Sequence, residues 1–238
     1  MIIDKERQIR NSALYLLPLF VASVLPLISL AIFTRVLTKN DFGIFALAQI
    51  IAIFFNGLGN LGMTAAYDRN FFQYRNDKVK TAQLLCTVIL FVIFNFIILT
   101  IGTFIFKSDL SKFIIGSSKY GNLILFTTIA QLLSGSNYYY LAYFKNNELA
   151  ASYAGYTICT SIINLLAAIF FVVFMKVGVI GLAFAQLLAN GTIFISLNFK
   201  FRSNFPLSFD RKLLIEMLII AYPLTPRIFL GARPWPCP

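Results

Sequence analysis

Amide and hydroxyl side chains recur at helical intervals inside long apolar stretches of this chain. Such side chains donate and accept hydrogen bonds without carrying charge, which is the chemistry that recognises a sugar or another ligand rich in hydroxyl groups. At about 100° per residue they fall on one face of each of four stretches. These residues are Gln49, Asn56, Asn60 and Tyr67; Gln131, Ser134 and Tyr138, with the charged Lys145 aligned on the same face; Tyr153, Thr157, Thr160 and Asn164; and Gln186 and Asn190.

Polar side chains in an apolar segment have two interpretations. They bond one helix to the next, an interaction often worth less than about 1 kcal/mol in a membrane, or they line a wet cavity, because hydrocarbon cannot satisfy them. For a single residue, bonding between helices is the simpler interpretation, but the stripes together favour a polar cavity. The residues predicted to bind ligand there are Gln49, Asn56, Asn60, Gln131, Tyr138, Asn164 and Asn190.

Catalytic and metal chemistry have little support in the sequence. Histidine is absent and the three cysteines have no paired spacing, so we expect no metal site and no cofactor. Apart from Glu216, the carboxylates lie at or beyond the ends of the apolar stretches, which leaves no acidic pair for general acid and base catalysis. We therefore expect a protein that is not an enzyme.

Gly57, Gly59 and Gly62 spell G-x-G-x-x-G, the pattern of dinucleotide-binding turns. That pattern is meaningful only between a strand and a helix, whereas here it lies inside an apolar stretch. In a membrane helix, small residues let neighbouring helices approach closely. The motif therefore predicts tight packing.

The apolar stretches are long enough to cross a bilayer. A helix rises about 1.5 Å per residue and must span roughly 30 Å of hydrocarbon, so about twenty residues suffice. The chain is 59% hydrophobic and 12% charged, against about a quarter charged in soluble domains. The predicted fold is all-α: a polytopic transmembrane helix bundle with six complete spans and a truncated seventh that begins near Ser208, a candidate N-cap. The six spans are predicted at residues 12–33, 42–67, 81–106, 122–144, 149–175 and 178–199.

Basic residues predict the orientation of the bundle. The N-terminal segment and the second, fourth and sixth connections together carry about twice as many lysines and arginines as the alternate connections, and basic residues are retained on the cytoplasmic side. A cytoplasmic N-terminus is therefore expected. The net charge of +11 fits this bias and attraction to anionic lipid, with contact to an acidic substrate as the alternative. No basic patch on a soluble module predicts nucleic-acid binding.

Several ordered segments resemble the polysaccharide biosynthesis membrane proteins, the O-antigen and capsule flippases of the multidrug/oligosaccharidyl-lipid/polysaccharide exporter superfamily. The resemblance covers roughly residues 8–226. Its segments are Thr34-Arg35-Val-Leu-Thr-Lys-Asn-Asp-Phe-Gly43, Leu61-Gly62-Met with Arg69, Tyr140-Leu-Ala-Tyr-Phe-Lys145, Gly178-Val-Ile-Gly181, and Ala221-Tyr-Pro223-Leu-Thr-Pro226.

The resemblance implies a carrier that moves an undecaprenyl-diphosphate-linked oligosaccharide from the cytoplasmic to the outer leaflet of a bacterial inner membrane. The polar stripes would serve the sugar, while a diphosphate needs cations. Arg35 and Arg69 match basic positions at helix ends in the family pattern. With Lys145, they are the residues expected to bind the diphosphate.

The family resembles two lobes of about six helices, whereas this chain supplies one lobe, residues 1–206, and the start of a second, residues 207–238. After Pro226 the sequence continues Arg-Ile-Phe-Leu-Gly-Ala-Arg-Pro-Trp-Pro-Cys-Pro, and alternating prolines cannot continue a spanning helix. The sequence thus predicts a truncated carrier, which would need a second copy or a separately encoded second half.

Two other functions stay open. A multidrug or metabolite exporter of the same superfamily would share the helix count, but the shortage of acids inside the spans disfavours it. A membrane-embedded polysaccharide polymerase would normally show a long extracytoplasmic loop with catalytic polar residues, and the connections here are short.

Overall fold

A computed structural model describes the backbone of residues 2–204 and 209–230, and the side chains of residues 14–202 and 209–223. This part of the chain consists of helices joined by short connections and contains no strand, which confirms the all-α prediction. Its elements are α1 (Ile2–Phe33), α2 (Lys39–Asn60), α3 (Met63–Gln73), α4 (Lys78–Ile115), the 3₁₀ turn η1 (Ser118–Tyr120), α5 (Gly121–Asn146), α6 (Ala150–Ile169), the π-helical turn η2 (Phe170–Phe174), α7 (Ile180–Asn204) and α8 (Arg211–Leu230).

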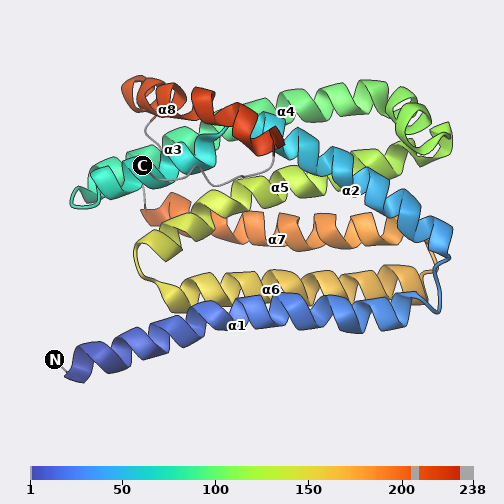
Figure 1. Ribbon diagram of the computed structural model, residues 1–238, viewed down its shortest axis with the longest axis horizontal. Helices are drawn as coiled ribbons and strands as arrows, with labels where there is room; N and C mark the ends of the chain where they lie inside the picture. Colours follow the sequence, from blue (N-terminus) through green and yellow to red (C-terminus); the bar gives the residue numbers. More distant parts are fainter. Residues whose placement is uncertain (1, 205–208, 231–238) are drawn as a thin grey trace.

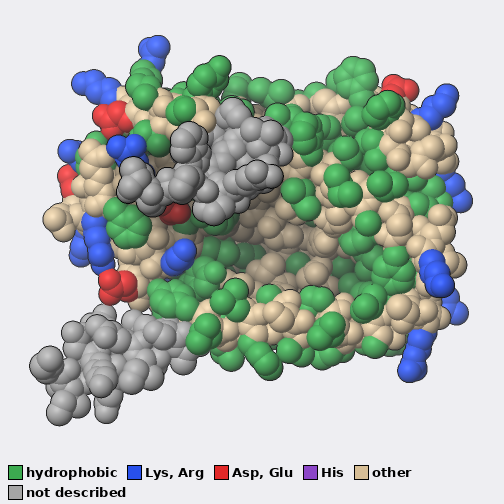
Figure 2. Space-filling view, viewed as in Figure 1, with side chains coloured by type: hydrophobic (Ala, Val, Ile, Leu, Met, Phe, Trp, Pro, Cys, Tyr) green, Lys and Arg blue, Asp and Glu red, His purple; other side chains and the backbone are tan. Residues whose placement is uncertain are grey.

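The long helices lie side by side as a bundle (Figure 1). The central helix is α5, which packs against α2, α4, α6 and α7, while α1 packs on α6 at one edge and α8 packs on α3 and α4 at the other. Charged side chains gather at the two ends of the bundle, and apolar side chains dominate the surface between them (Figure 2). This is the surface of a protein that spans a bilayer.

Five described helices are long and apolar enough to cross a membrane: α1 from Leu14, α2, α4, α6 with its π-helical turn, and α7. Exposed side chains such as Phe20, Ile50, Phe94 and Ile195 form their lipid-facing surface. The remaining predicted span is α5, which has 26 residues but a more polar composition. Its central position accounts for this, because its neighbours rather than lipid surround it.

Side chains and glycines set the helix ends. Asp41 N donates to Thr38 Oγ1 at 3.2 Å, and Thr38 N donates to Asp41 Oδ2 at 2.9 Å, which forms a capping box at the start of α2. Asp77 caps α4, which ends where Gly116 adopts a left-handed conformation with a φ of 83°. The predicted cap Ser208 lies outside the described residues, and Asp210 caps α8 because its Oδ1 accepts from Lys212 N at 2.8 Å.

The prediction of one continuous helix over residues 42–67 is wrong. The helix breaks at Leu61 and Gly62, whose φ angles of 45° and 74° lie in the left-handed region, and α3 begins at Met63. Hydropathy continues through the break, so it gave no signal of the kink. The predicted end of the third span is also too early, because α4 continues to Ile115 beyond its apolar part.

Two glycines of the G-x-G-x-x-G motif, Gly59 and Gly62, serve close packing, as predicted. A side chain at Gly59 would overlap the ring of Phe96 on α4. A Cβ at Gly62 would lie 2.6 Å from the carbonyl oxygen of Ala221 on α8. The backbone of α8 therefore rests directly on the break between α2 and α3.

A second contact holds α8 against α3. Tyr74 OH donates a hydrogen bond to Glu216 Oε2 at 3.0 Å. This bond raises the pKa of the Tyr74 hydroxyl above its ordinary value, because ionisation would remove the donor proton and place two negative charges together. The predicted proline-rich end of the chain, residues 231–238, lies outside the described residues.

We predict that Gly62→Ala destabilises the protein. A left-handed backbone costs a residue with a Cβ about 1–2 kcal/mol, and the overlap with Ala221 adds to this. The free energy of unfolding in detergent should fall by about 2 kcal/mol or more. The matched control is Gly102→Ala in α4, where a Cβ meets no atom within 4 Å. Equal stability of the two variants would contradict this account of the break.

Candidate functional site

A polar cavity of about 370 Å³ lies between α2, α5, α6 and α7, with α3 at one side. Its lining consists of amides, hydroxyls, one glycine and one leucine, with no Asp, Glu, Lys or Arg among the described residues. The lining residues are Asn56, Asn60, Thr64, Ser134, Gly135, Asn137, Tyr138, Leu141, Thr157, Thr160, Ser161 and Asn190. The cavity is thus rich in hydrogen-bonding groups and neutral.

A chain of hydrogen bonds fixes the α2 wall of the cavity. The buried Tyr139 OH donates to Asn60 Oδ1 at 2.7 Å, and Asn60 Nδ2 donates to Asn56 Oδ1 at 2.7 Å. Gly135 makes room for Asn56, since a Cβ there would overlap its amide oxygen. The two asparagines are therefore held in defined orientations before any ligand arrives.

The α7 wall is held to α5 in a similar way. Asn137 Nδ2 donates to the carbonyl oxygen of Asn190 at 3.0 Å, and Asn190 Nδ2 donates to the carbonyl oxygen of Gln186 at 3.0 Å. Asn137 Oδ1 is buried and has no hydrogen-bond partner in the described part of the chain. A buried acceptor without a donor is unfavourable, so this oxygen is ready to accept from water or from a ligand hydroxyl.

One carboxylate lies beside the cavity without lining it. Tyr138 OH donates to Asp68 Oδ2 at 3.4 Å, and Asn146 Nδ2 donates to Asp68 Oδ1 at 3.0 Å. These bonds tie α3 to α5 at the end of the bundle where α1 begins. Tyr138 is 40% exposed, so its ring is accessible from the cavity.

A second cavity of about 540 Å³ adjoins the first, between α1, α2, α6 and α7. Ser161 lines both cavities, while Pro26, Asn164 and Gln186 line the second. Figure 2 shows this face of the bundle hollowed between α2 and α6. Gln49 Nε2 donates to Gln186 Oε1 at 2.6 Å and so ties α2 to α7.

The structure brings some of the predicted ligand-binding residues together and separates others. Asn56, Asn60, Tyr138 and Asn190 line the polar cavity. Asn164 lines the second cavity, where its buried Oδ1 has no partner among the described residues. The side chain of Gln49 bonds Gln186 instead of lining a cavity, and Gln131 is half-buried and lines neither cavity. That the residues lining the cavities bind a ligand stays a prediction.

The three predicted cations are exposed and line neither cavity. Arg69 and Lys145 lie at the end of the bundle where α1 begins, and Arg35 follows α1 at the opposite end (Figure 1). The 22 residues of α2 separate Arg35 from Arg69, which is about 33 Å along a helix. Arg35 therefore cannot share one diphosphate with the other two cations in this conformation.

Sequence reasoning missed three polar lining residues: Thr64, Asn137 and Ser161. All three had a signal, because Thr64 follows Asn60 by four residues, Asn137 follows Ser134 by three and Ser161 follows Thr157 by four, the spacings that share a helix face.

Comparisons place the chain among known proteins. The family described as "Polysaccharide biosynthesis protein" matches residues 32–230. The chain belongs to this family. Comparison with curated proteins gave no match.

Solved structures with the same fold are transporters. They include an outward-facing multidrug resistance MATE family transporter of the MOP superfamily (17% identity, TM-score 0.72, 94% of this chain and 53% of that chain). They also include the Vibrio cholerae MATE transporter VcmN in the bent form (15% identity, TM-score 0.71, 94% of this chain and 54% of that chain). A Pyrococcus furiosus MOP superfamily transporter, described as having a binding pocket of reverse polarity, matches as well (16% identity, TM-score 0.71, 94% of this chain and 53% of that chain). The chain spans about half the length of these structures.

We predict opposite outcomes for two neighbouring buried tyrosines. Tyr139→Phe removes the donor to Asn60 and should cost about 1–3 kcal/mol of unfolding free energy, because a buried acceptor loses its partner. Tyr67→Phe is the matched control: its ring lies 5.7 Å from that of Tyr139, it is equally buried, and its hydroxyl has no partner among the described residues. This variant should be as stable as the wild type in chemical unfolding. Similar losses in both would refute the role of the Tyr139 hydrogen bond.

Proposed function

We propose that this protein is a lobe of a flippase that moves an undecaprenyl-diphosphate-linked oligosaccharide across a bacterial inner membrane for O-antigen or capsular polysaccharide synthesis. The observation that carries the proposal is the neutral, hydrogen-bonding lining of the polar cavity. A sugar offers a hydroxyl group on most of its carbons and needs many weak partners. Membership of the polysaccharide biosynthesis family supports the same class of cargo.

Amides that are already oriented favour sugar binding. Because Asn60 and Asn56 are fixed by Tyr139, a ligand does not have to order them on binding, and less conformational entropy is lost. Asn137 Oδ1 supplies an acceptor without a partner among the described residues. The exposed ring of Tyr138 offers an apolar face on which a pyranose could stack.

The diphosphate would lie outside the cavity, at the membrane surface. Arg69 and Lys145 are exposed at one end of the bundle, and there they would hold the phosphates while the sugar enters between the helices. Arg35 lies at the opposite end. It is suited to receive the phosphates after translocation, so the two arginines would act at different stages of transport.

Alternating access needs a second lobe opposite the first. We propose that residues 1–206 form the first lobe and that residues 207–238 begin the second, with the N-terminus in the cytoplasm. The solved transporters with this fold are about twice as long as the matched part of the chain. A second lobe would close the hollowed face of the first.

Export of drugs is the rival function, and the names of the solved MATE structures favour it. A cationic drug or a coupling cation would need a carboxylate in the cavity. None of the described lining residues supplies one, and Asp68 beside it is bonded to Tyr138 and Asn146. The lining therefore favours an uncharged head group.

We predict that removing two cavity hydroxyls weakens sugar binding. In Thr157→Val/Thr160→Val the side chains keep their shape, and the lost hydroxyls bonded only backbone carbonyls of α6. The affinity of the purified chain for lipid-linked oligosaccharide should fall about tenfold, since each hydrogen bond contributes roughly 0.5–1.5 kcal/mol. Thr192→Val is the control, because its hydroxyl makes the same kind of bond on a lipid-facing side of α7. Unchanged binding in the double variant would exclude this cavity as the sugar site.

A second prediction concerns transport in the cell. Loss of the protein should leave lipid-linked oligosaccharide on the cytoplasmic leaflet, and Arg69→Ala should do the same while the folded protein stays at its normal level. Arg75→Ala is the control, because Arg75 lies at the same end but is already paired with Glu148 at 2.5 Å. Leaflet-specific labelling of the sugar reads out the result. Unpolymerised material on the outer leaflet would instead indicate a polymerase.

A further inference from the structure

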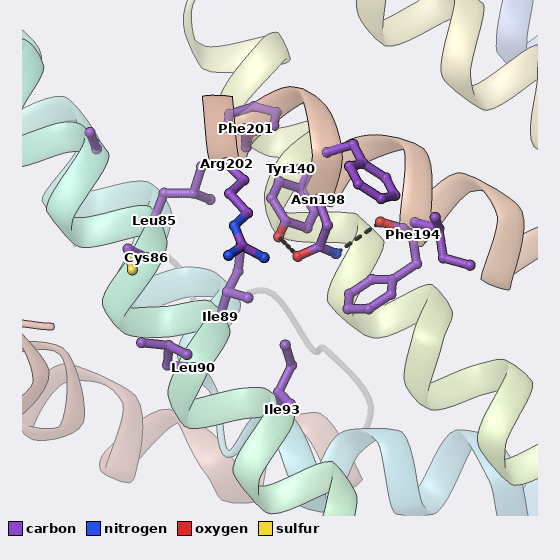
Figure 3. A pocket seen from close by; sticks show the side chains of 13 residues that line it. Leu85, Cys86, Ile89, Leu90, Ile93, Tyr140, Phe194, Asn198, Phe201 and Arg202 are labelled. Atoms are coloured by element: carbon purple, nitrogen blue, oxygen red, sulfur yellow. Dashed lines mark hydrogen bonds between the residues drawn. The ribbon is translucent and has the colours of Figure 1, made fainter. Parts of the chain in front are cut away.

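A separate groove of about 350 Å³ lies on the outer side of the bundle, between α4 and α7 (Figure 3). Its walls are largely apolar, with Leu85 and Ile89 from α4 and Phe194 and Phe199 from α7. The groove and the polar cavity share no lining residue: α4 lines only the groove, whereas α2, α3 and α6 line only the cavity. The groove therefore does not belong to the proposed sugar site.

Two uncharged polar side chains that line the groove, Tyr140 and Asn198, bond each other. Tyr140 OH donates to Asn198 Oδ1 at 2.9 Å, and Asn198 Nδ2 donates to the carbonyl oxygen of Phe194 at 2.8 Å. Figure 3 shows these bonds at the α5 side of the groove. With these groups satisfied, the floor of the groove suits an apolar occupant.

Arg202 supplies a positive charge at one end of this groove. Its guanidinium points from the end of α7 into the space beside Ile89 (Figure 3). The side chain is exposed, and no carboxylate among the described side chains forms an ion pair with it. A guanidinium beside apolar surface, without a counter-ion among the described side chains, is suited to bind a phosphate by two parallel hydrogen bonds.

The length of the groove matches one leaflet of a bilayer. On α4 it extends from Ala82 to Ile93, which is about 16 Å along a helix. Half of the hydrocarbon core is about 15 Å thick. The apolar span of α7 ends at Arg202, so its backbone lies where lipid head groups begin, and its guanidinium reaches back into the groove beside Ile89.

We propose that the groove is a binding site for an anionic phospholipid, with an acyl chain between α4 and α7 and the phosphate on Arg202. The charge of Arg202 complements the phosphate, and the length of one leaflet fits an acyl chain better than a prenyl chain that is several times longer. The site lies in the leaflet at the end of the bundle where α1 begins. It is independent of the proposed transport of sugars.

Native mass spectrometry of the purified full chain tests this site. Phosphatidylglycerol, phosphatidylcholine and undecaprenyl phosphate are each titrated into the detergent solution, and the bound fraction is measured. The wild type should retain one phosphatidylglycerol about tenfold more tightly than phosphatidylcholine, and Arg202→Gln should lose about tenfold in that affinity. Lys78→Gln is the matched control. It also removes one exposed positive charge, at the start of α4, but Lys78 does not line the groove.

A groove-filling variant tests the position of the chain. Ile93→Trp should reduce phosphatidylglycerol binding while Arg202 is intact, and the elution profile and unfolding temperature check that each variant is folded. Should Ile93→Trp fail to fold, the phosphatidylglycerol affinities of Arg202→Gln and Lys78→Gln still test the site. Equal binding by those two variants would overturn the proposal. Retention of undecaprenyl phosphate at least as tight as that of phosphatidylglycerol would overturn the choice of a phospholipid.

Discussion

A polar group inside a membrane must form hydrogen bonds with protein or with water, and this constraint acts most strongly on α5. It is surrounded by α2, α4, α6 and α7, and it contributes Tyr139 and Asn137 to the hydrogen bonds that fix the cavity walls. Because hydrocarbon offers no alternative partner, these bonds set where the neighbouring helices lie. The position of the cavity follows from the polarity of its central helix.

The positions of the membrane-crossing stretches and most of the polar cavity could be predicted from the sequence. Lipid imposes length and hydropathy on each helix, and the helical period then places residues such as Asn56 and Thr160 on one face. The helical period identifies which residues lie on the same side of one helix. It does not say which of them meet a neighbour, so Gln49 and Gln131 were grouped with the lining although neither reaches it.

The break between α2 and α3 could not be predicted in the same way. Residues 61 and 62 belong to an apolar sequence, and glycine is tolerated inside membrane helices. The left-handed conformation at Gly62 goes with the close approach of the α8 backbone, a contact across more than 150 residues of sequence. The separation of Arg35 from Arg69 likewise depends on the direction of the helices between them, which a charge pattern alone does not contain.

The contact between Gly62 and Ala221 has a mechanical consequence. At Leu61 and Gly62 the regular α-helical conformation is interrupted, so α2 and α3 are separate segments, each with its own internal hydrogen bonds. The backbone of α8 touches the chain at this same point. A displacement of α8 would therefore press on the junction of α2 and α3, and α3 carries Asp68, which bonds Tyr138 at the edge of the cavity.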